Sequence, residues 1–308
     1  QTFLSTLTQI NSSSFFSKIT GKKNYSLALE IALVNQQIRF QITCSNEISA
    51  FVQTQIQSNY PLVIIEKGQD SLEDKNLYIK TLSLKHGNYY PITLWNTFAD
   101  VDPLSSILSV LSKSNPDQLT IVQLALQSVS SSWQSKGTSF ADKGTKNDDG
   151  TYSPRSDKNV IKEKISYPGF KVSIRLASNT KKTLTELVDA FGVFTRSDGN
   201  SFGLKKMITK NSKNENNKLK ERKVSDNQIL NIVELATIWH LPSAKIQTPT
   251  IAWGTSVLSE PPENLPSSIN VSDEDKKNIN FFAHTIFKNK DTIFGIKDKD
   301  RRKHIWTI

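Results

Sequence analysis

The stretch Gly169-Phe-Lys-Val-Ser-Ile-Arg-Leu176 alternates apolar and polar side chains from Phe170 onward. This period of two is typical of a β-strand with one buried face. The flanking sequence predicts, in chain order, a short strand at 89–94, a helix opening at Pro103, a strand at 118–129, a helix at 184–191 and a last strand at 201–208. With 170–176 in the middle, the predicted order is strand, helix, strand, strand, helix, strand.

That order is the one found in ferredoxin-like folds, in which two helices cover one face of a four-stranded antiparallel sheet. The first part of the chain shows a related pattern, with helices expected at 3–10 and 48–56, a hairpin at 27–33 and 38–44, and a strand at 62–65. It completes the same fold if an opening strand lies before Gln1. We therefore expect an α+β protein with two tandem ferredoxin-like units, at 1–86 and 87–209.

The remaining segments differ in composition. Residues 130–163 are polar and almost free of aliphatic side chains, so we expect a long mobile loop inserted in the second unit. Residues 210–224 are rich in charge and predict a linker. We expect 225–270 to form a helix and then a proline-rich extended tether, and 271–308 to form strands, the last at 304–308.

The overall charge favours an anionic partner. Lys and Arg outnumber Asp and Glu by 39 to 29, which gives a formal net charge of +10. Such a balance suits nucleic acid or an anionic membrane face, although many soluble proteins are modestly basic. The single cysteine, Cys44, cannot form an internal disulfide and indicates a reducing compartment. No run of about 18 apolar residues predicts a membrane span, and an anchor before Gln1 stays open.

Motifs for catalysis or metal binding are missing from the sequence. No Gly-x-x-x-x-Gly-Lys-Ser/Thr loop occurs, so we expect this chain alone neither to hold a nucleotide nor to hydrolyse ATP. The four histidines stand far apart and a single cysteine accompanies them, which gives a zinc site no support. The sequence predicts no catalytic residue, no metal site and no cofactor within the chain.

A basic face is the remaining candidate site. Lys171, Ser173 and Arg175 alternate with the apolar positions of the 170–176 strand and should point outward. Together with Lys205 and Lys206, Lys171 and Arg175 are candidate nucleic-acid contacts, and a merely solvated face is the alternative.

Six segments carry a resemblance to a known family, and the last three of them contain Trp239, Trp253 and Arg301-Arg302. They are Asp100-Val-Asp-Pro-Leu-Ser-Ser106, the stretch from Gln123 to Trp133, Gly169-Phe-x-Val-x-Ile-Arg175, Glu234-Leu-Ala-Thr-Ile-Trp-His240-Leu-Pro-Ser, Thr248-Pro249-x-Ile251-x-Trp253 with Glu260-Pro-Pro-Glu-Asn-Leu-Pro266, and Phe294-Gly-Ile-x-x-x-Asp300-Arg301-Arg302-x-His304-Ile. The chain resembles the region before the motor in type IV secretion and conjugative DNA-transfer ATPases of the HerA/FtsK superfamily. In those proteins the nucleotide-binding loop follows a segment similar to 294–305.

The resemblance implies a function for the whole protein. It implies a DNA-translocating ATPase with ATP and Mg²⁺ in its motor, for which this chain would be a truncated, non-catalytic accessory region with 271–308 as the first strands of the motor domain. The implied partners are DNA or nucleoprotein, the chain's own ATPase domain, a hexameric ring of copies and secretion-channel proteins. The implied location is the cytoplasm, at the inner face of the membrane. Candidate motor-docking residues are Trp239, His240, Trp253, Arg301 and Arg302.

Two other readings stay open from the residues alone. The chain could be a stand-alone nucleic-acid-binding module, for which steeply salt-dependent DNA affinity is expected. It could also be an assembly adaptor that contacts only protein, for which weak DNA binding and specific oligomerisation are expected.

Overall fold

A computed structural model describes residues 1–12, 25–61, 63–72, 75, 77–99, 101–113, 115, 117–205, 212–242, 251, 265–287 and 290–301. The chain forms two compact units, Gln1–Gln55 with Gln69–Ala252, and Ile56–Gly68 with Trp253–Ile308. Among the described helices, none is both long and apolar enough to cross a membrane. The proline-rich stretches 243–250 and 252–264, and with them Trp253, lie outside the described residues, as do Lys206, Arg302 and the expected strand 304–308.

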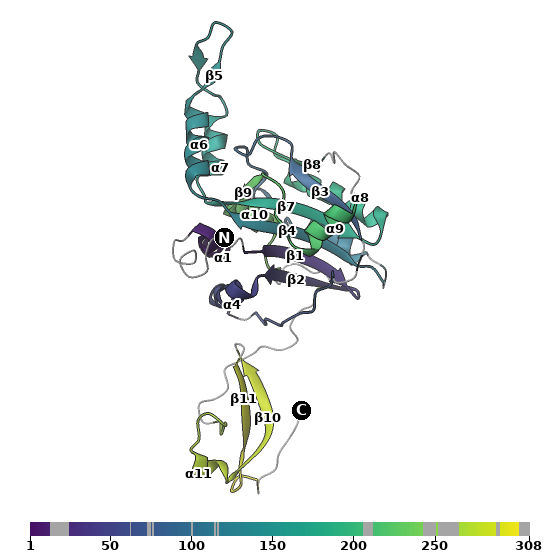
Figure 1. The fold of residues 1–308 in the computed structure, drawn as a ribbon, viewed down its shortest axis with the longest axis vertical. Coiled ribbons are helices and arrows are strands. Elements are labelled where there is room, and N and C mark those ends of the chain that lie inside the picture. Colours follow the sequence, from purple (N-terminus) through teal and green to yellow (C-terminus); the bar gives the residue numbers. More distant parts are fainter. Residues whose placement is uncertain are drawn as a thin grey trace. The chain divides into compact units, whose positions relative to one another are not determined.

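The first unit is a mixed α+β structure built on one seven-stranded antiparallel sheet (Figure 1). The strand order is β2-β1-β4-β7-β3-β8, and β9 also pairs with β7. The strands are β1 (Leu27–Val34), β2 (Gln37–Cys44), β3 (Tyr78–Leu84), β4 (Thr120–Ser128), β7 (Gly169–Ser178), β8 (Phe202–Leu204) and β9 (Ile229–Asn231).

Helices surround this sheet. They are α1 (Thr2–Leu7), α2 (Gln9–Ser12), α4 (Asn46–Asn59), α5 (Ser105–Ser112), α6 (Ser132–Asp142), α7 (Lys158–Ile165), α8 (Lys181–Ala190), α9 (Ser212–Lys220) and α10 (Ile232–Ile238), with 3-10 turns η1 (Trp95–Thr97) and η2 (Phe191–Phe194). The second unit contains α11 (Asp273–Lys276) and the hairpin of β10 (Ile279–Phe287) and β11 (Lys290–Lys297).

The alternating stretches are strands, as predicted. β1 and β2 pair in register from Leu27 with Cys44 to Val34 with Gln37. Asn35 and Gln36 between them have φ of 49° and 64°, which matches the two-residue turn that suits the twist of a hairpin. The expected strands 118–129 and 170–176 are β4 and β7, and the helix expected at 184–191 is α8.

The two halves share one sheet, so the expectation of two separate sheets is wrong. β1 pairs with β4 over Ala28–Leu33, which joins the first hairpin to the later strands. The prediction of a strand at 89–94 is also wrong, because β3 at Tyr78–Leu84 is the strand that pairs with β7 there. Pro91 lacks an N–H, and the N–H of Ile92 bonds to the Glu234 carboxylate instead of to a strand. Residues 63–65 are likewise not a strand.

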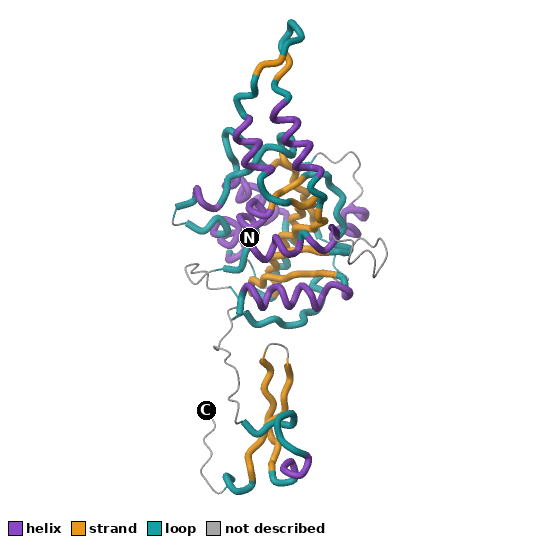
Figure 2. Tube along the Cα trace, turned by 90° about the vertical axis from the view of Figure 1, so that its left-hand side faces the viewer, coloured by secondary structure: helices purple, strands orange, loops and turns teal. Residues whose placement is uncertain are grey.

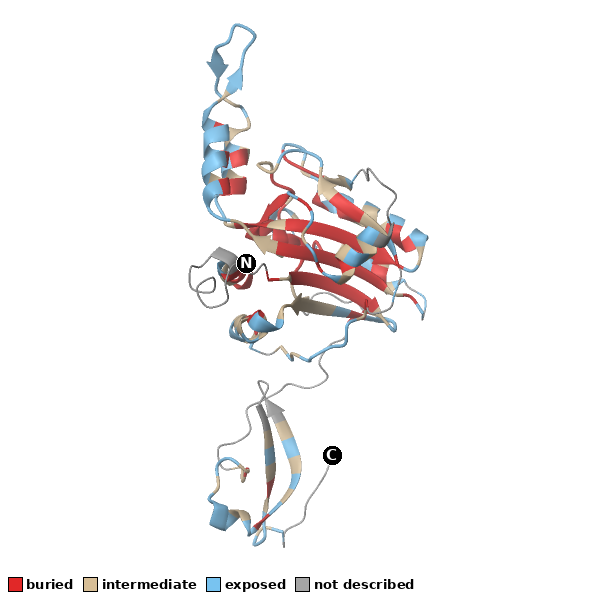
Figure 3. Cartoon of the chain, viewed as in Figure 1, coloured by how far each residue is buried: buried red, intermediate tan, exposed pale blue. Residues whose placement is uncertain are grey.

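Both faces of the central strands β1, β4 and β7 are buried (Figure 3). Phe170, Val172, Ile174 and Leu176 are buried on one face of β7, as expected. The opposite face of β7 was expected to be solvated, but Ser173 and Arg175 are fully buried. Leu219 of α9 packs there with Ala177, and the chain after α9 bonds to Ser173 and Arg175. The predicted linker 210–224 is thus largely a helix that completes the core.

The insertion forms an arm, defined as residues 132–165, and not the mobile loop that its composition indicates (Figure 2). α6 and α7 pack side by side, and a small hairpin of β5 (Thr145–Lys146) and β6 (Tyr152–Ser153) connects them. Trp133, Gly137 and Ala141 form the buried side of α6, and Ile161 and Ile165 form that of α7. A narrow buried stripe is therefore enough to order this polar segment.

Candidate functional site

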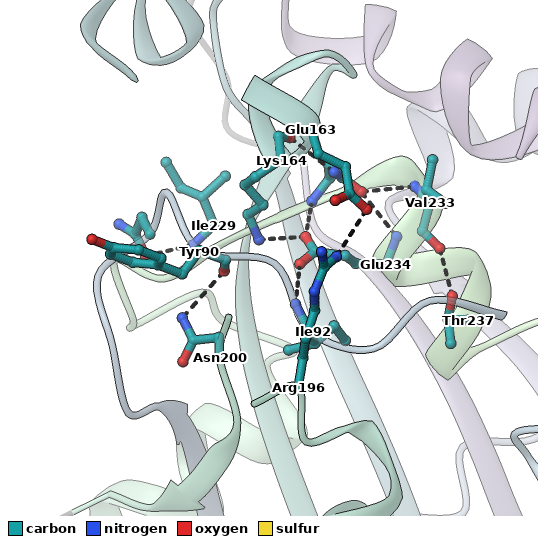
Figure 4. A network of polar contacts seen from close by, with 12 residues as sticks. Tyr90, Ile92, Glu163, Lys164, Arg196, Asn200, Ile229, Val233, Glu234 and Thr237 are labelled. Carbon is teal, nitrogen blue, oxygen red and sulfur yellow. Dashed lines mark hydrogen bonds and ion pairs between the residues drawn. The ribbon is translucent and has the colours of Figure 1, made fainter. Parts of the chain in front are cut away.

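A buried ion pair joins the arm to the end of the sheet (Figure 4). The Lys164 ammonium at the base of α7 donates to Glu234 Oε2 on α10, and both side chains have no exposed area. Burial lowers the pKa of Lys164 below its ordinary value, and the charge of Glu234 opposes that shift. Because neither side chain reaches solvent, Lys164 is an anchor and not an accessible nucleophile.

The Glu234 carboxylate is also the hydrogen-bond acceptor for two backbone segments. Ile92 N donates to Oε1 at 3.0 Å, and Asn231 N donates to Oε2 at 2.8 Å. Asn231 Oδ1 in turn accepts from Val233 N and Glu234 N, which completes a capping box at the start of α10. One carboxylate thus holds together the arm, the 91–94 segment and α10.

Two ion-pair clusters surround this anchor nearer the surface. Arg196 bonds to Glu163 at 2.9 Å and to Asp198 at 2.7 Å. In the second cluster, Asp157 accepts from Arg155 Nε at 2.8 Å and from the Tyr90 hydroxyl at 2.6 Å. The hydrogen bond from Arg155 is the largest of the effects that lower the pKa of Asp157 to about 2. These contacts fix the orientation of the arm.

A polar row crosses the interior of the sheet. Glu30, Gln123 and Arg175 face one another on β1, β4 and β7. Gln123 Nε2 donates to Glu30 Oε1 at 2.7 Å, and Arg175 Nη1 donates to Gln123 Oε1 at 3.1 Å. Arg222 closes the row, with Nε 3.2 Å from Glu30 Oε1 and both Nη atoms on the Asp70 carboxylate at 2.6 and 2.7 Å. The row explains how charged side chains occupy this core.

A histidine and an aspartate meet at the end of α10. His240 Nε2 lies 3.0 Å from Asp102 Oδ2, and His240 Nδ1 lies 2.8 Å from Ala236 O. Burial is the largest single effect and raises the pKa of Asp102, but the hydrogen bond and electrostatic attraction of His240 and the hydrogen bond from Leu104 N together outweigh it, so the pKa is lower than usual. Both ring nitrogens already have partners, so this pair ties α10 to the 102–104 segment and lacks the free nitrogen that a general base needs.

The candidate contacts from the sequence are scattered. Arg175 is fully buried in the polar row, and Trp239 is 3% exposed with its Nε1 donating to Glu30 O at 3.2 Å. Neither side chain is available at the surface, because segments distant in sequence cover them. Lys205 pairs with Asp226, Lys171 is half-buried on β7, and Arg301 is exposed 3.7 Å from Asp298.

The structure brings together an aromatic and basic group that the sequence patterns did not single out. Tyr78 and Lys80 alternate on β3 and face α8, which begins with Lys181 and Lys182. The alternation of Tyr78 with Lys80 and the adjacent lysines of α8 were the available signals. The two residues of β3 and the two lysines of α8 stand about 100 residues apart in the sequence, and only the pairing of β3 with β7 brings them together.

Metal ions have no evident site among the residues that the structure describes, since no group of three His, Cys, Asp or Glu side chains is placed to hold one. Across the same part of the chain, the buried charged clusters bond to the protein itself. Their arrangement can position segments and fix the arm, and it offers no assembled nucleophile or acid–base pair.

Comparisons place the chain in a family. No curated protein and no solved structure matches it. Residues 1–254 match a family described as a domain of unknown function, DUF8128. This match takes in the sheet, the arm and α10, and it covers well over half of the chain. The chain therefore belongs to the DUF8128 family.

Proposed function

We propose that this chain is the accessory, non-catalytic region of a DNA-translocating P-loop ATPase of the type IV secretion kind. In this role it positions the motor on DNA or on the secretion machinery. ATP and Mg²⁺ belong to the motor, and a hexameric ring of copies is part of the proposal through the resemblance alone.

The segment Glu234–His240 carries the proposal. It is the part of the chain that most closely resembles the pre-motor region of those ATPases. Glu234 holds the arm, Thr237 Oγ1 accepts from Trp95 N at 3.1 Å, and Trp239 and His240 bond to distant segments. Four side chains of this segment thus have partners far away in the chain, which ties the segment's sequence to this fold. That supports reading the resemblance as a shared fold and not as a chance match of residues.

A finer fold assignment belongs to the same proposal. The strands β8-β3-β7-β4 are adjacent and antiparallel, and in chain order they are the fourth, first, third and second of the set, with α5 and α8 as the connecting helices. This supports a ferredoxin-like unit at 78–204 with the arm inserted between its second and third strands. β1 and β2 then extend its sheet beyond β4.

A protein–protein adaptor is the second candidate, and the arm favours it. The arm is fixed at its base by Lys164 and Asp157, and most of its residues from Asp142 to Pro154 are exposed. A rigid, exposed projection loses little entropy when a partner binds it. The stand-alone nucleic-acid binder is the third candidate.

Nucleotide hydrolysis by the complete gene product separates these candidates. The translocase proposal expects ATP hydrolysis that DNA stimulates, with the stimulation reduced when residues 1–254 are deleted. The binder expects salt-dependent DNA affinity without hydrolysis, and the adaptor expects neither. A complete product that fails to bind ATP would refute the translocase proposal.

A further inference from the structure

The usual nucleic-acid platform of a four-stranded α+β unit, an open sheet face with aromatic side chains, is not available here. Both faces of the central strands are buried, and Arg175 is part of the internal polar row. A nucleic-acid contact on this unit therefore has to use an edge or a helix surface.

One such surface lies where β3 and α8 meet, and we call it the Tyr78 surface, made of Tyr78, Lys80, Lys181 and Lys182. Tyr78 is 50% exposed, and the Lys181 ammonium lies 5.0 Å from its ring centroid. The Lys80 ammonium bonds to Thr185 Oγ1 on α8 at 3.2 Å, so a neutral hydroxyl holds it at this surface. Among the described residues, β8 pairs with β3 at Leu82–Leu84, and Tyr78 at the start of β3 pairs with Ser178 of β7.

Lys182 of this surface is less strongly neutralised than Lys164 and Lys205. Lys182 lies 3.9 Å from Glu186, and its side chain is 88% exposed. Such a pair contributes little and is readily exchanged for a phosphate. By contrast, Lys164 and Lys205 are engaged by carboxylates at contact distance.

We propose that the Tyr78 surface binds single-stranded nucleic acid. A base stacks on the exposed part of the Tyr78 ring, and Lys80, Lys181 and Lys182 bind the flanking phosphates. An exposed aromatic ring among weakly paired cations is the combination that single-strand-binding proteins use without sequence preference. This inference rests on the proposed function, because it names the surface through which the accessory region contacts DNA.

The test measures binding of fluorescein-labelled oligothymidine and of a duplex to the full chain by anisotropy, at several salt concentrations. Tyr78→Ala should weaken single-strand binding roughly 5- to 150-fold, the range for removal of one stacked base, whereas Tyr78→Phe should keep it. Replacing Lys181 and Lys182 by Gln should make the negative slope of log K against log salt shallower by about 0.7 for each phosphate that the variant no longer binds.

Tyr152→Ala is the matched control. Tyr152 is also 50% exposed and also has a lysine, Lys143, over its ring at 5.8 Å, but it lies at the arm tip. Binding that is weakened at Tyr78 and unchanged at Tyr152 supports the inference. Wild-type binding that Tyr78→Ala leaves unchanged, or a preference for the duplex, overturns it while leaving the proposed function intact. If the wild-type chain binds neither DNA, the inference is wrong and so is direct DNA contact by this region.

Discussion

Replacing Glu234 by Gln should destabilise the first unit strongly, because it leaves the Lys164 ammonium buried without a counter-charge. Both side chains have no exposed area, so water cannot take the place of the carboxylate. Breaking a buried pair on one side costs about 3–5 kcal/mol. The amide also keeps only one acceptor oxygen for Ile92 N and Asn231 N, which adds to the destabilisation.

The assay is urea unfolding followed by near-ultraviolet circular dichroism, analysed as a double-mutant cycle with Lys164→Met. Each single variant should lose about 3–5 kcal/mol, and the double variant should lose clearly less than the sum, because it contains no unpaired charge. Glu163→Gln is the matched control. It makes the same change next to Lys164 in a pair with partly exposed Arg196, and it should cost about 1 kcal/mol or less.

Two results would refute this reasoning. One is a destabilisation by Glu234→Gln no larger than that by Glu163→Gln. The other is strict additivity of the cycle, which would mean that the two charges stabilise the unit independently and that the arm is not anchored through their contact.

Other substitutions probe the polar row, the arm and the arm base. Arg222→Met should cost about 3–5 kcal/mol in urea unfolding, since it leaves the 1%-exposed Glu30 carboxylate without its cation; a cost under about 1 kcal/mol would contradict this. Gly137→Ala should cost about 1–3 kcal/mol, because a Cβ there would lie 2.6 Å from a side-chain carbon of the neighbouring helix. Gly192→Ala, with open space around the added Cβ, is the control and should be close to neutral. Equal melting temperatures of the two variants would argue against the packing of α6 on α7. Asp157→Asn should cost about 1 kcal/mol near neutral pH. Because the folded pKa of about 2 lies below the ordinary value of 3.8, this contribution is fully present well above pH 3.8 and is lost as the pH falls through 2, so a gap between wild type and variant that is as large at pH 2 as at neutral pH would be inconsistent with it.

The sequence by itself determined the local elements. Alternation over 27–33, 38–44 and 170–176 identified β1, β2 and β7, because a half-buried or buried strand reveals its period in the order of its own side chains. The break between the runs 27–33 and 38–44 likewise predicted a hairpin, and the structure places its turn at Asn35 and Gln36, both with positive φ. Each of these depends on residues close together in the chain.

Only the tertiary structure decided how those elements combine. The pairing of β1 with β4 merged two expected sheets into one, and it depends on segments about 90 residues apart. The helices of the arm pack through a narrow buried stripe that includes Gly137, Ala141 and Ile161. These few residues do not stand out in a segment whose composition is mostly polar. Arg175 alternates like a surface residue, yet the carbonyl of Lys223 and the hydroxyl of Ser225 come back to cover it. A charged side chain is stable inside a protein only when polar partners bond to it, and here those partners come from a distant segment. The local sequence pattern does not show which segment that is.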